Sequence, residues 1–552
     1  MRVLRLKIVC VMTALALLAP LALAQQAPDA LATALDLRPA QAPPQAATGP
    51  ADPGASMPAP VLADDAAAGA AGVMIGAVSV AGGDRLDARE LSAAYEPYIG
   101  QEASSDSLRS LARSVADLAR RQGYLFASAQ VPAQAVRLGV VRVDLDLGAV
   151  DEVRIVGSEN PRLRQILQGV VGPAPRREAV ERRLLLAGDL PGVKIRNTRY
   201  ERSSGRGVLI VETELRPISW EVSADSYGPE TLGPWRAGAM VEADGLQRGA
   251  GALSLQALNS VDQPRELTWI GGRYVRTSAD GATQSGVAIS SGRARPGGAL
   301  RRYDLESENL YAAVFASHAL QRTRASSVWL NGEVAHVQAE QTVARAPLLE
   351  DAVTTATIGL SGSRALGAAR LDGGLSVTRG LALSGDTRRG DPRASRSDGG
   401  GVFTRANAWT SFWTPVGQQY SLKLAALAQI ASRALLASQE ITLGGPMFGR
   451  AYDYAERFGD DGAMASIELR RHFGKLAGLL RDAHVYGYAD AGRVTNQSGG
   501  FGGGSLSSAG VGLRGQVGHA QVSAELAAPL GADRFASGDR SPRLNVGLRL
   551  KF

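Results

Sequence analysis

The chain has 552 residues and a formal net charge of +7, from 60 basic and 53 acidic side chains. So small a charge without any run of Lys or Arg argues against nucleic-acid binding. The single cysteine, Cys10, and five histidines scattered without ligand spacing give no pattern for a disulfide framework or a metal site. The chain also shows no Gly-x-Ser-x-Gly nucleophile motif and no Walker-type phosphate loop, so we expect neither a catalytic site nor a cofactor.

Residues 1–24 have the pattern of a secretory signal peptide. Three basic residues precede an apolar run from Ile8 to Leu23, and Ala22-Leu23-Ala24 supplies the small residues of a cleavage site. A membrane anchor is the alternative, but the run is short and proline-rich polar sequence follows it. We therefore expect export, a mature chain without cysteine, and no transmembrane helix.

Residues 25–72 divide into a helical candidate and a linker. Residues 25–38 place Leu31 and Leu35 on one side of a possible helix, although a disordered N-terminus fits this composition equally well. Residues 39–72 are rich in Pro and Ala, which favours an extended and semi-rigid linker.

Residues 73–148 have the pattern of a small α/β unit. Ser104 or Ser105 can cap a helix, and the apolar residues that follow recur with the 3.6-residue period of one helix face. Gly123 ends this helix. The predicted elements are a strand (73–80), a helix (87–98), the capped helix (from 104 or 105 to 123) and two strands (125–131 and 140–147).

The same order of elements repeats in residues 149–216, and an internal repeat of about 70 residues is a strong architectural signal. Gln122-Gly123-Tyr124, Pro132-Ala133-Gln134 and the stretch from Gly139 to Gly157 resemble the polypeptide-transport-associated (POTRA) domain. The resemblance implies two periplasmic POTRA domains. The predicted elements of the second are a strand (150–156), two helices (161–170 and 178–187) and two strands (194–201 and 207–215).

From residue 217 to residue 552 the helical period is replaced by alternation of apolar and polar residues. Strict alternation gives a strand one dry and one wet face, and about 16 such segments can be marked. A closed transmembrane β-barrel satisfies the backbone of such strands in lipid, whereas an array of soluble β-sandwiches would normally show domain breaks. The last strand ends at Phe552, and Leu548, Leu550 and Phe552 resemble the signal by which outer-membrane barrels are recognised for insertion by the barrel-assembly machinery.

The whole combination resembles the outer-membrane transporters of two-partner secretion, the TpsB family, which includes the haemolysin and filamentous-haemagglutinin exporters. Residues 223–228, YADAGRV (488–494), SAGVGLRG (508–515) and ELAAPLG (525–531) fit its barrel strands. The resemblance implies an outer-membrane protein that captures an unfolded exoprotein with its POTRA domains, by adding a strand to a sheet edge, and exports it through the barrel lumen. It also implies that residues 25–38 plug the pore at rest. The expected partners are a large secreted exoprotein, the barrel-assembly machinery and membrane lipid, and no nucleic acid.

Two alternatives stay open. A barrel-assembly insertase of the same superfamily would act on many clients, but such proteins usually carry more POTRA repeats. A solute channel would have no periplasmic α/β repeats, so residues 73–216 count against it.

The stretch from Ile441 to Arg470 contains a Gly-rich loop of about 18 residues, and loops of this length are usually functional or disordered. In the superfamily, a loop that folds back into the barrel carries a motif close to Val-Arg-Gly-Phe/Tyr with Gly-Asp-x-Gly downstream. This chain has Gly449, Arg450, Ala451 and Tyr452, followed by Gly459, Asp460 and Gly462. The Arg and the aromatic residue match, but Gly449 and Ala451 depart from the motif at positions that bear on the loop's backbone geometry.

The partner of Arg450 can be predicted from physical chemistry alone. A guanidinium inside a barrel is costly unless it is paired, and its planar fork suits a carboxylate. Asp490 alternates with the apolar residues of its strand and should point into the lumen, so it is the first choice of partner. Glu468, on the wet face of its own strand, is the second. Such a pair either serves transport or only stabilises the barrel.

Overall fold

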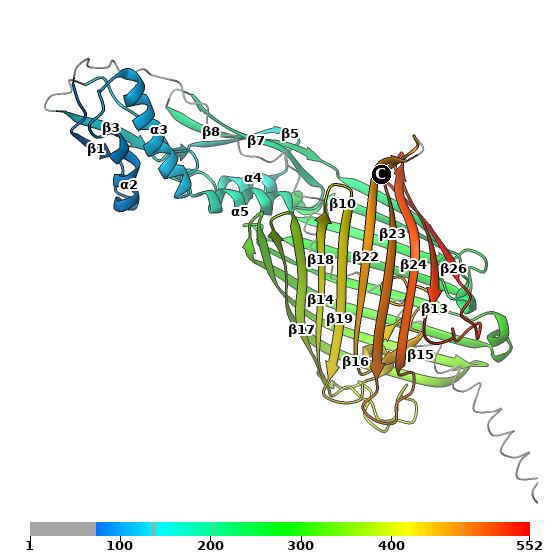
Figure 1. The fold of residues 1–552 in the computed structure, drawn as a ribbon. Helices are drawn as coiled ribbons and strands as arrows, with labels where there is room; N and C mark the ends of the chain where they lie inside the picture. Colours follow the sequence, from blue (N-terminus) through cyan, green and yellow to red (C-terminus); the bar gives the residue numbers. More distant parts are fainter. Residues whose placement is uncertain (1–72, 135–138, 204, 477) are drawn as a thin grey trace, which may run out of the picture.

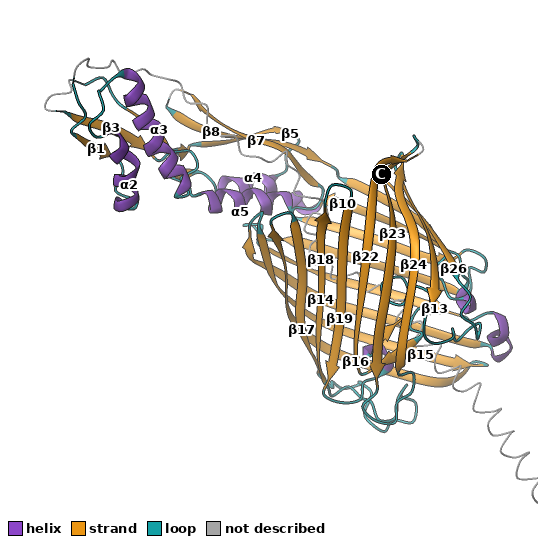
Figure 2. Cartoon of the chain, viewed as in Figure 1, coloured by secondary structure: helices purple, strands orange, loops and turns teal. Residues whose placement is uncertain are grey.

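The computed structural model describes residues 73–552, apart from 135–138, 204 and 477 (Figure 1). The predicted signal peptide (1–24), helix (25–38) and linker (39–72) lie outside the described residues. The described chain forms two α/β units in a row, followed by a β-barrel (Figures 1 and 2).

The first unit is a three-stranded sheet covered by two helices. Strand order is β1-β3-β2, with β1 parallel and β2 antiparallel to β3. The Asp87 side chain caps the first helix, and Ser104, one of the two predicted residues, caps the second by accepting from Ser107 N at 3.2 Å. The elements are β1 (Ala77–Ala81), α2 (Ala88–Tyr95), η2 (Glu96–Tyr98), α3 (Ser105–Arg121), β2 (Ser128–Gln130) and β3 (Val140–Asp146).

The second unit has the same topology, with strand order β5-β8-β7 and the same parallel and antiparallel pairings. Asn160 caps α4 by accepting from Leu163 N at 2.8 Å. The elements are β4 (Ala149–Val150), β5 (Glu152–Gly157), α4 (Pro161–Gln168), β6 (Gly172–Pro173), α5 (Arg177–Gly188), β7 (Val193–Ser203) and β8 (Arg206–Leu215).

The two α/β units have separate cores, and a short segment of the first unit joins them. The predicted strand 125–131 is shorter than expected, because Leu125 and Phe126 leave the first sheet and pack among the buried residues of the second unit. The Phe126 ring stacks on that of Tyr200 with centroids 4.0 Å apart. Arg177 N donates to Gly123 O at 2.8 Å, and Arg202 Nη1 donates to Ser128 Oγ at 3.0 Å. We call the two joined units the arm.

Sixteen antiparallel strands form the closed barrel. The connections near the arm are short turns, whereas those at the far end include the long loops 381–403 and 432–460 (Figure 1). This asymmetry is typical of outer-membrane barrels, with short periplasmic turns and long extracellular loops. The barrel strands are β9 (Ile218–Asp225), β10 (Arg236–Gly245), β11 (Gly251–Ser260), β12 (Leu267–Thr277), β13 (Thr283–Ala294), β14 (Leu305–Arg322), β15 (Ser326–Val343), β16 (Ala346–Leu366), β17 (Ala369–Gly380), β18 (Thr404–Val416), β19 (Tyr420–Ala431), β22 (Asp461–Leu476), β23 (Leu480–Thr495), β24 (Gly504–Val517), β25 (Ala520–Pro529) and β26 (Arg543–Lys551).

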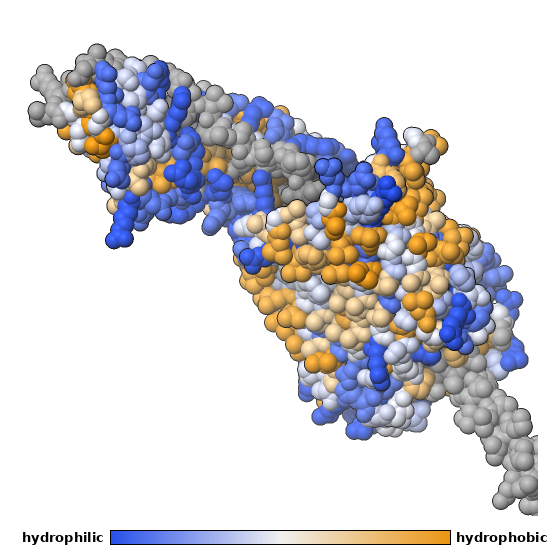
Figure 3. Space-filling model, viewed as in Figure 1, coloured by the Kyte–Doolittle hydropathy of each residue, from blue (hydrophilic) through white to orange (hydrophobic). Residues whose placement is uncertain are grey.

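The strands alternate as their sequence predicts, with aliphatic side chains on the outside and polar ones in the lumen. Ile270, Ile289 and Leu375 are among the exposed aliphatic residues of the outer face, which forms a hydrophobic belt between two more hydrophilic rims (Figure 3). A surface of this kind is suited to lipid. Among the helices of the described residues, none has the length and apolar character of a membrane-spanning segment.

The barrel closes where β26 pairs with β9, over residues 547–551 and 221–225. Beyond these pairs, Trp220 and Phe552 exchange both backbone hydrogen bonds, at 3.0 and 3.2 Å. The Phe552 ring stacks on Trp220 with centroids 3.9 Å apart and lies 5.5 Å from that of His519. The terminal aromatic residue therefore fastens the closing seam in addition to resembling an insertion signal.

Replacing Phe552 with alanine is expected to lower both the heat resistance of the folded barrel and the amount inserted. The stacked pair contributes about 1 kcal/mol beyond its buried area, and heat-modifiable gel mobility measures the loss. Trp220→Ala removes the same stack but keeps the terminal Phe, so it should lower only the heat resistance. Equal insertion of all three proteins would contradict a signal role for Phe552.

The second α/β unit is docked on the barrel at the short turns that follow β10, β12 and β14. Arg322 donates to both carboxylate oxygens of Asp189 at 2.7 and 2.8 Å, and Arg182 Nη2 donates to Ala319 O at 2.7 Å. Ala282, Ala319 and Trp329 of the barrel belong to the same buried apolar cluster as the helices of this unit. This joint combines a hydrophobic contact with a bidentate ion pair, which fixes its geometry.

Candidate functional site

The connection between β19 and β22, residues 432–460, folds back into the barrel. It is longer than predicted, because Ile441–Leu443 forms β20 inside the loop and pairs with β21 (Arg457–Gly459). A short 3₁₀ helix, η5 (Ala437–Gln439), precedes it. Apolar loop side chains pack on the inner face of β22–β25: Ile441, Leu443, Phe448, Ala451 and Tyr452 against Met464, Tyr486, Tyr488, Val494, Leu506 and Ala527.

The tip of this loop is a compact turn that presents Arg450. Gly449 has a φ of 77°, a left-handed conformation that favours glycine, whereas Ala451 does not fall in that region. The two departures from the family motif are therefore compatible with the turn. Tyr452 N donates to Gly449 O at 2.9 Å, and the buried Tyr452 hydroxyl donates to Ala532 O at 2.9 Å. This aromatic residue anchors the turn to the barrel wall.

Arg450 reaches three carboxylates on three different strands. Its Nε lies 3.1 Å from Asp490 Oδ2, and its Nη1 lies 2.8 Å from Glu468 Oε2 and 3.4 Å from Glu525 Oε2. Its Nη2 donates to Ser466 Oγ at 2.9 Å, and its Cζ stands 3.7 Å from the centroid of the Tyr488 ring. The guanidinium is thus held by charge, hydrogen bonds and an aromatic face together.

The charges of the groups in direct contact balance, and the Lys423 ammonium lies nearby as one further cation. Arg470 Nε and Arg514 Nη1 also contact Glu468, at 2.7 and 3.0 Å, so three guanidinium groups face three carboxylates. The Tyr486 hydroxyl donates to Glu525 at 2.8 Å. Asp490 and Glu525 are almost fully buried. A neutral network with this many hydrogen bonds is how a protein tolerates charges away from water. We call these six charged residues the Arg450 cluster.

A second buried arginine ties the extracellular loops together. Arg396, from the loop 381–403, donates to Glu440, to Asp460 Oδ1 at 2.9 Å and to Asn496 Oδ1 at 3.2 Å. Asp398 accepts from its Nε and Nη2 at 3.1 and 3.0 Å. The side chains of Glu440 and Asp460 have no exposed surface. We call these residues the Arg396 cluster.

The structure separates the two motifs that the sequence placed in one loop. Asp460 belongs to the Arg396 cluster, where it also accepts from Leu435 N at 2.6 Å and Gln497 N at 2.9 Å. Gly459 is the last residue of β21, and Gly462 lies in β22 and not in the loop. A Cβ on Gly459 would come within 2.6 Å of Thr495 O, and one on Gly462 within 2.8 Å of Val494. The Gly-Asp-x-Gly motif is therefore a closely packed segment at the base of the loop.

Comparison with known proteins decides the family. Residues 205–515 match the family described as haemolysin secretion/activation protein ShlB/FhaC/HecB, and residues 73–147 match the ShlB-type POTRA domain. The chain belongs to the ShlB/FhaC/HecB family.

Individual relatives of this ShlB/FhaC/HecB protein are distant. The heme/hemopexin transporter protein HuxB of Haemophilus influenzae strain 86-028NP is 28% identical over 181 residues, 31% of this chain and 32% of HuxB. The chain thus aligns with about a third of the length of this curated relative. CdiB from Escherichia coli has a similar fold, with a TM-score of 0.71 at 19% identity over 87% of this chain and 90% of CdiB. CdiB from Acinetobacter baumannii also has a similar fold, with a TM-score of 0.61 at 16% identity over 87% of this chain and 90% of that one.

Family and fold together make this an outer-membrane β-barrel with its POTRA domain in the periplasm. BamA from Haemophilus ducreyi without its POTRA domains 1–3 also shares the fold, with a TM-score of 0.50 at 14% identity over 85% of this chain and 99% of that one. At that identity the likeness concerns the fold alone.

Several charged residues of these two clusters are not among the site residues predicted from the sequence. Glu525, Arg470 and Arg514 all face the lumen, and their alternation with apolar neighbours could have indicated this orientation. Arg396 has no such signal, since it lies in an irregular loop 44 residues from Glu440 and 64 from Asp460.

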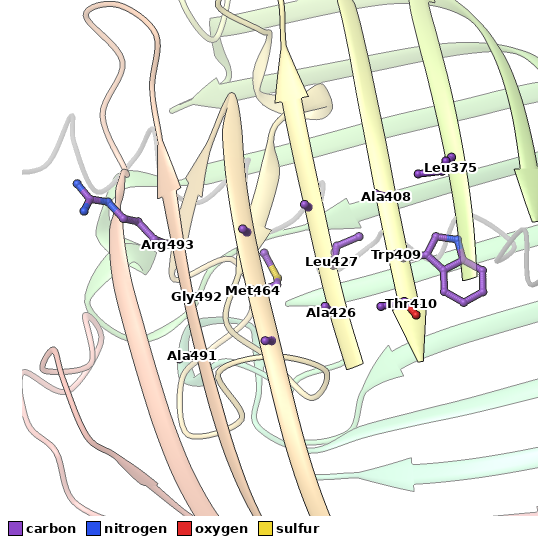
Figure 4. Close-up of a pocket in the computed structure, with 13 residues that line it drawn as sticks. Leu375, Ala408, Trp409, Thr410, Ala426, Leu427, Met464, Ala491, Gly492 and Arg493 are labelled. Atoms are coloured by element: carbon purple, nitrogen blue, oxygen red, sulfur yellow. The ribbon is translucent and has the colours of Figure 1, made fainter. Parts of the chain in front are cut away.

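A cavity of about 780 Å³ lies apart from the Arg450 cluster. It is an apolar depression on β17, β18, β19, β22 and β23, bordered by small side chains such as Ala408, Ala426 and Ala491 (Figure 4). No group of three or more His, Cys, Asp or Glu side chains in the described part of the chain is arranged to hold a metal ion. The Arg450 cluster is a set of ion pairs that connects the loop 432–460 to the barrel wall.

Proposed function

We propose that this protein is the outer-membrane transporter of a two-partner secretion system. It would recognise one large unfolded exoprotein in the periplasm and export it through the barrel lumen, without a catalytic step of its own. The observation that carries the proposal is the loop 432–460, folded into the lumen of a family-type barrel and held there by the Arg450 cluster.

The loop would act as an internal gate. An ion-paired arginine can exchange partners without chemistry, so a passing chain that competes for the carboxylates could free the loop. The polar lumen supports this role: a cavity of about 550 Å³ is lined by groups such as Gln256, Asn331 and Ser361, which can form hydrogen bonds with an extended backbone.

The arm would capture the exoprotein. We propose that residues 149–216 are a second POTRA domain, because they repeat the topology of the matched first domain. The edge strand β7 offers eleven residues for strand addition, which recognises extended chains through their backbone. The barrel itself would be assembled by the barrel-assembly machinery, with Leu548, Leu550 and Phe552 as the signal.

The proposal is tested by comparing culture-supernatant, surface and outer-membrane proteomes with and without this protein. Loss of one large exoprotein, with other barrels unchanged, is the expected result and identifies the partner. A broad fall in outer-membrane barrels would contradict it and favour an insertase. An exoprotein profile that stays unchanged, under conditions where a large exoprotein is expressed, would contradict the proposal and favour a solute channel.

A further inference from the structure

The outer face of the barrel carries cations at the periplasmic ends of β22 and β23. On the outer face of β22, the exposed aliphatic residues Ile467 and Leu469 are followed by Arg471 and Phe473, which are exposed too. Lys475, also exposed, follows beyond a bulge at Gly474. Arg481 lies on β23. The change from aliphatic to basic side chains marks the level at which lipid hydrocarbon meets the headgroups. We call Arg471, Lys475 and Arg481 the rim cluster.

The rim cluster is poorly neutralised by the protein. Lys475 and Arg481 are partners in the β22–β23 register, which places two like charges on neighbouring strands. Arg481 Nη2 donates to Gly518 O in the β24–β25 turn at 3.0 Å, and this neutral acceptor leaves the charge of Arg481 uncompensated. Among the described residues, the ion pairs of β22 point into the lumen, towards Arg450, Arg470 and Arg514. The exposed Asp482 is the acidic neighbour in sequence and forms no ion pair within the described chain. The rim cluster thus keeps a local excess of positive charge.

Two aromatic rings hold Arg471 at this level. Tyr420 of β19 is its partner in the register, and the Arg471 Cζ lies 6.0 Å from the Tyr420 ring centroid and 5.0 Å from that of Phe473. Both rings are exposed on the lipid side, at 41% and 37%. Aromatic side chains prefer the membrane interface, and cation–π contacts keep the guanidinium beside them.

An apolar depression lies deeper on the same strands. Its volume is about 630 Å³, and Leu424, Ile467 and Ala489 line it on β19, β22 and β23. Leu469 lies between it and the rim cluster on the outer face of β22. A lipid with its headgroup at the rim cluster would therefore have a continuous aliphatic surface along which to lay its acyl chains.

We propose that the rim cluster binds the phosphate group of an anionic phospholipid in the periplasmic leaflet of the outer membrane. An Arg fork and a Lys ammonium offer charge-assisted hydrogen bonds to phosphate oxygens. An anionic headgroup such as phosphatidylglycerol compensates the like charges of Lys475 and Arg481, whereas phosphatidylethanolamine brings an ammonium of its own. The inference does not depend on the proposed export function, because it concerns the outer face of the barrel.

Native mass spectrometry of the full-length protein, released from nanodiscs of phosphatidylethanolamine with a minor share of phosphatidylglycerol, tests the inference. We expect retained phosphatidylglycerol in excess of its share in the disc. The triple variant Arg471→Gln, Lys475→Gln, Arg481→Gln should retain less phosphatidylglycerol. We expect the excess to fall by about fivefold for each cation removed, because each cation near the membrane surface attracts an anionic headgroup by about 1 kcal/mol. Raising the salt concentration should lower retention by the wild-type protein.

The matched control is Arg345→Gln, Arg388→Gln, Arg389→Gln, which removes the same charge from exposed positions in the extracellular loops. It should retain phosphatidylglycerol like the wild-type protein. Heat-modifiable gel mobility confirms that both variants are folded. Equal retention by all three proteins, or an equal loss in both variants, would overturn the assignment to the rim cluster. Displacement of the lipid by inorganic phosphate alone would reassign the cluster to free anions.

Discussion

Replacing Arg450 with alanine is expected to abolish export of the exoprotein and to release the loop 432–460 from the lumen. The substitution leaves Asp490 and Glu525 buried with one cation fewer, and an uncompensated buried charge costs about 3–5 kcal/mol. Arg470 and Arg514 still neutralise Glu468, so the barrel itself should stay closed. The readouts are exoprotein in the medium, protease cleavage within 432–460 on intact cells, and heat-modifiable gel mobility.

The variant Arg450→Lys separates a transport role from a structural one. It keeps the charge but loses the planar fork that contacts three carboxylates at once. We expect a normal amount of folded barrel and reduced export. Export that simply follows the amount of folded barrel in both variants would show that the cluster only stabilises it. Arg493→Ala is the matched control, because this exposed arginine lies on the same strand as Asp490 but points outwards.

Replacing Arg396 with alanine is expected to open the extracellular mouth of the barrel. The fully buried carboxylates of Glu440 and Asp460 would lose their shared cation, again at a cost of about 3–5 kcal/mol. The loops 381–403 and 432–460 should then separate, which raises the conductance of single barrels in planar bilayers and exposes 381–403 to protease. The Arg450 cluster shares no residue with this one, so the Tyr452 turn should stay in place.

The matched control for Arg396 is Arg388→Ala, an exposed arginine in the same loop. It should leave conductance and protease protection unchanged. Unaltered conductance in both variants would mean that the Arg396 cluster does not hold the mouth closed. If the clusters act independently, the effects of Arg396→Ala and Arg450→Ala on heat resistance should add.

Local patterns account for most of the fold. Ser104 caps α3 because a hydroxyl before an apolar 3.6-residue repeat satisfies the first free amide groups, and the alternation in 217–552 reflects two chemically different faces. The prediction of a closed barrel of about 16 antiparallel strands is confirmed, as is the family resemblance. Leu125 and Phe126 show where prediction from local patterns fails. Their sequence favours a strand, but their side chains pack into the core of the neighbouring unit instead.

The site is harder to predict than the fold. Asp490 and Glu468 could be proposed as partners of Arg450 because their strand parity turns them towards the lumen. Arg396 could not be found in this way, since an irregular loop has no parity and its partners are distant in sequence. The number of carboxylates around one arginine also depends on the register of four strands, which alternation alone does not determine.

The joint between the arm and the barrel has a mechanical consequence. The arm is fastened at one end only, through the chain that runs from β8 into β9 and at the barrel turns that follow β10, β12 and β14, and the first α/β unit projects beyond the barrel rim (Figure 1). It is a cantilever. A load on its free end becomes a bending moment at the Asp189–Arg322 pair, and this moment enters the barrel wall beside its longest strands, β14, β15 and β16. Stress from a chain held at the tip is thus delivered to the arc of the barrel wall from β9 to β15, which does not include β22 and β23, the strands of Glu468 and Asp490.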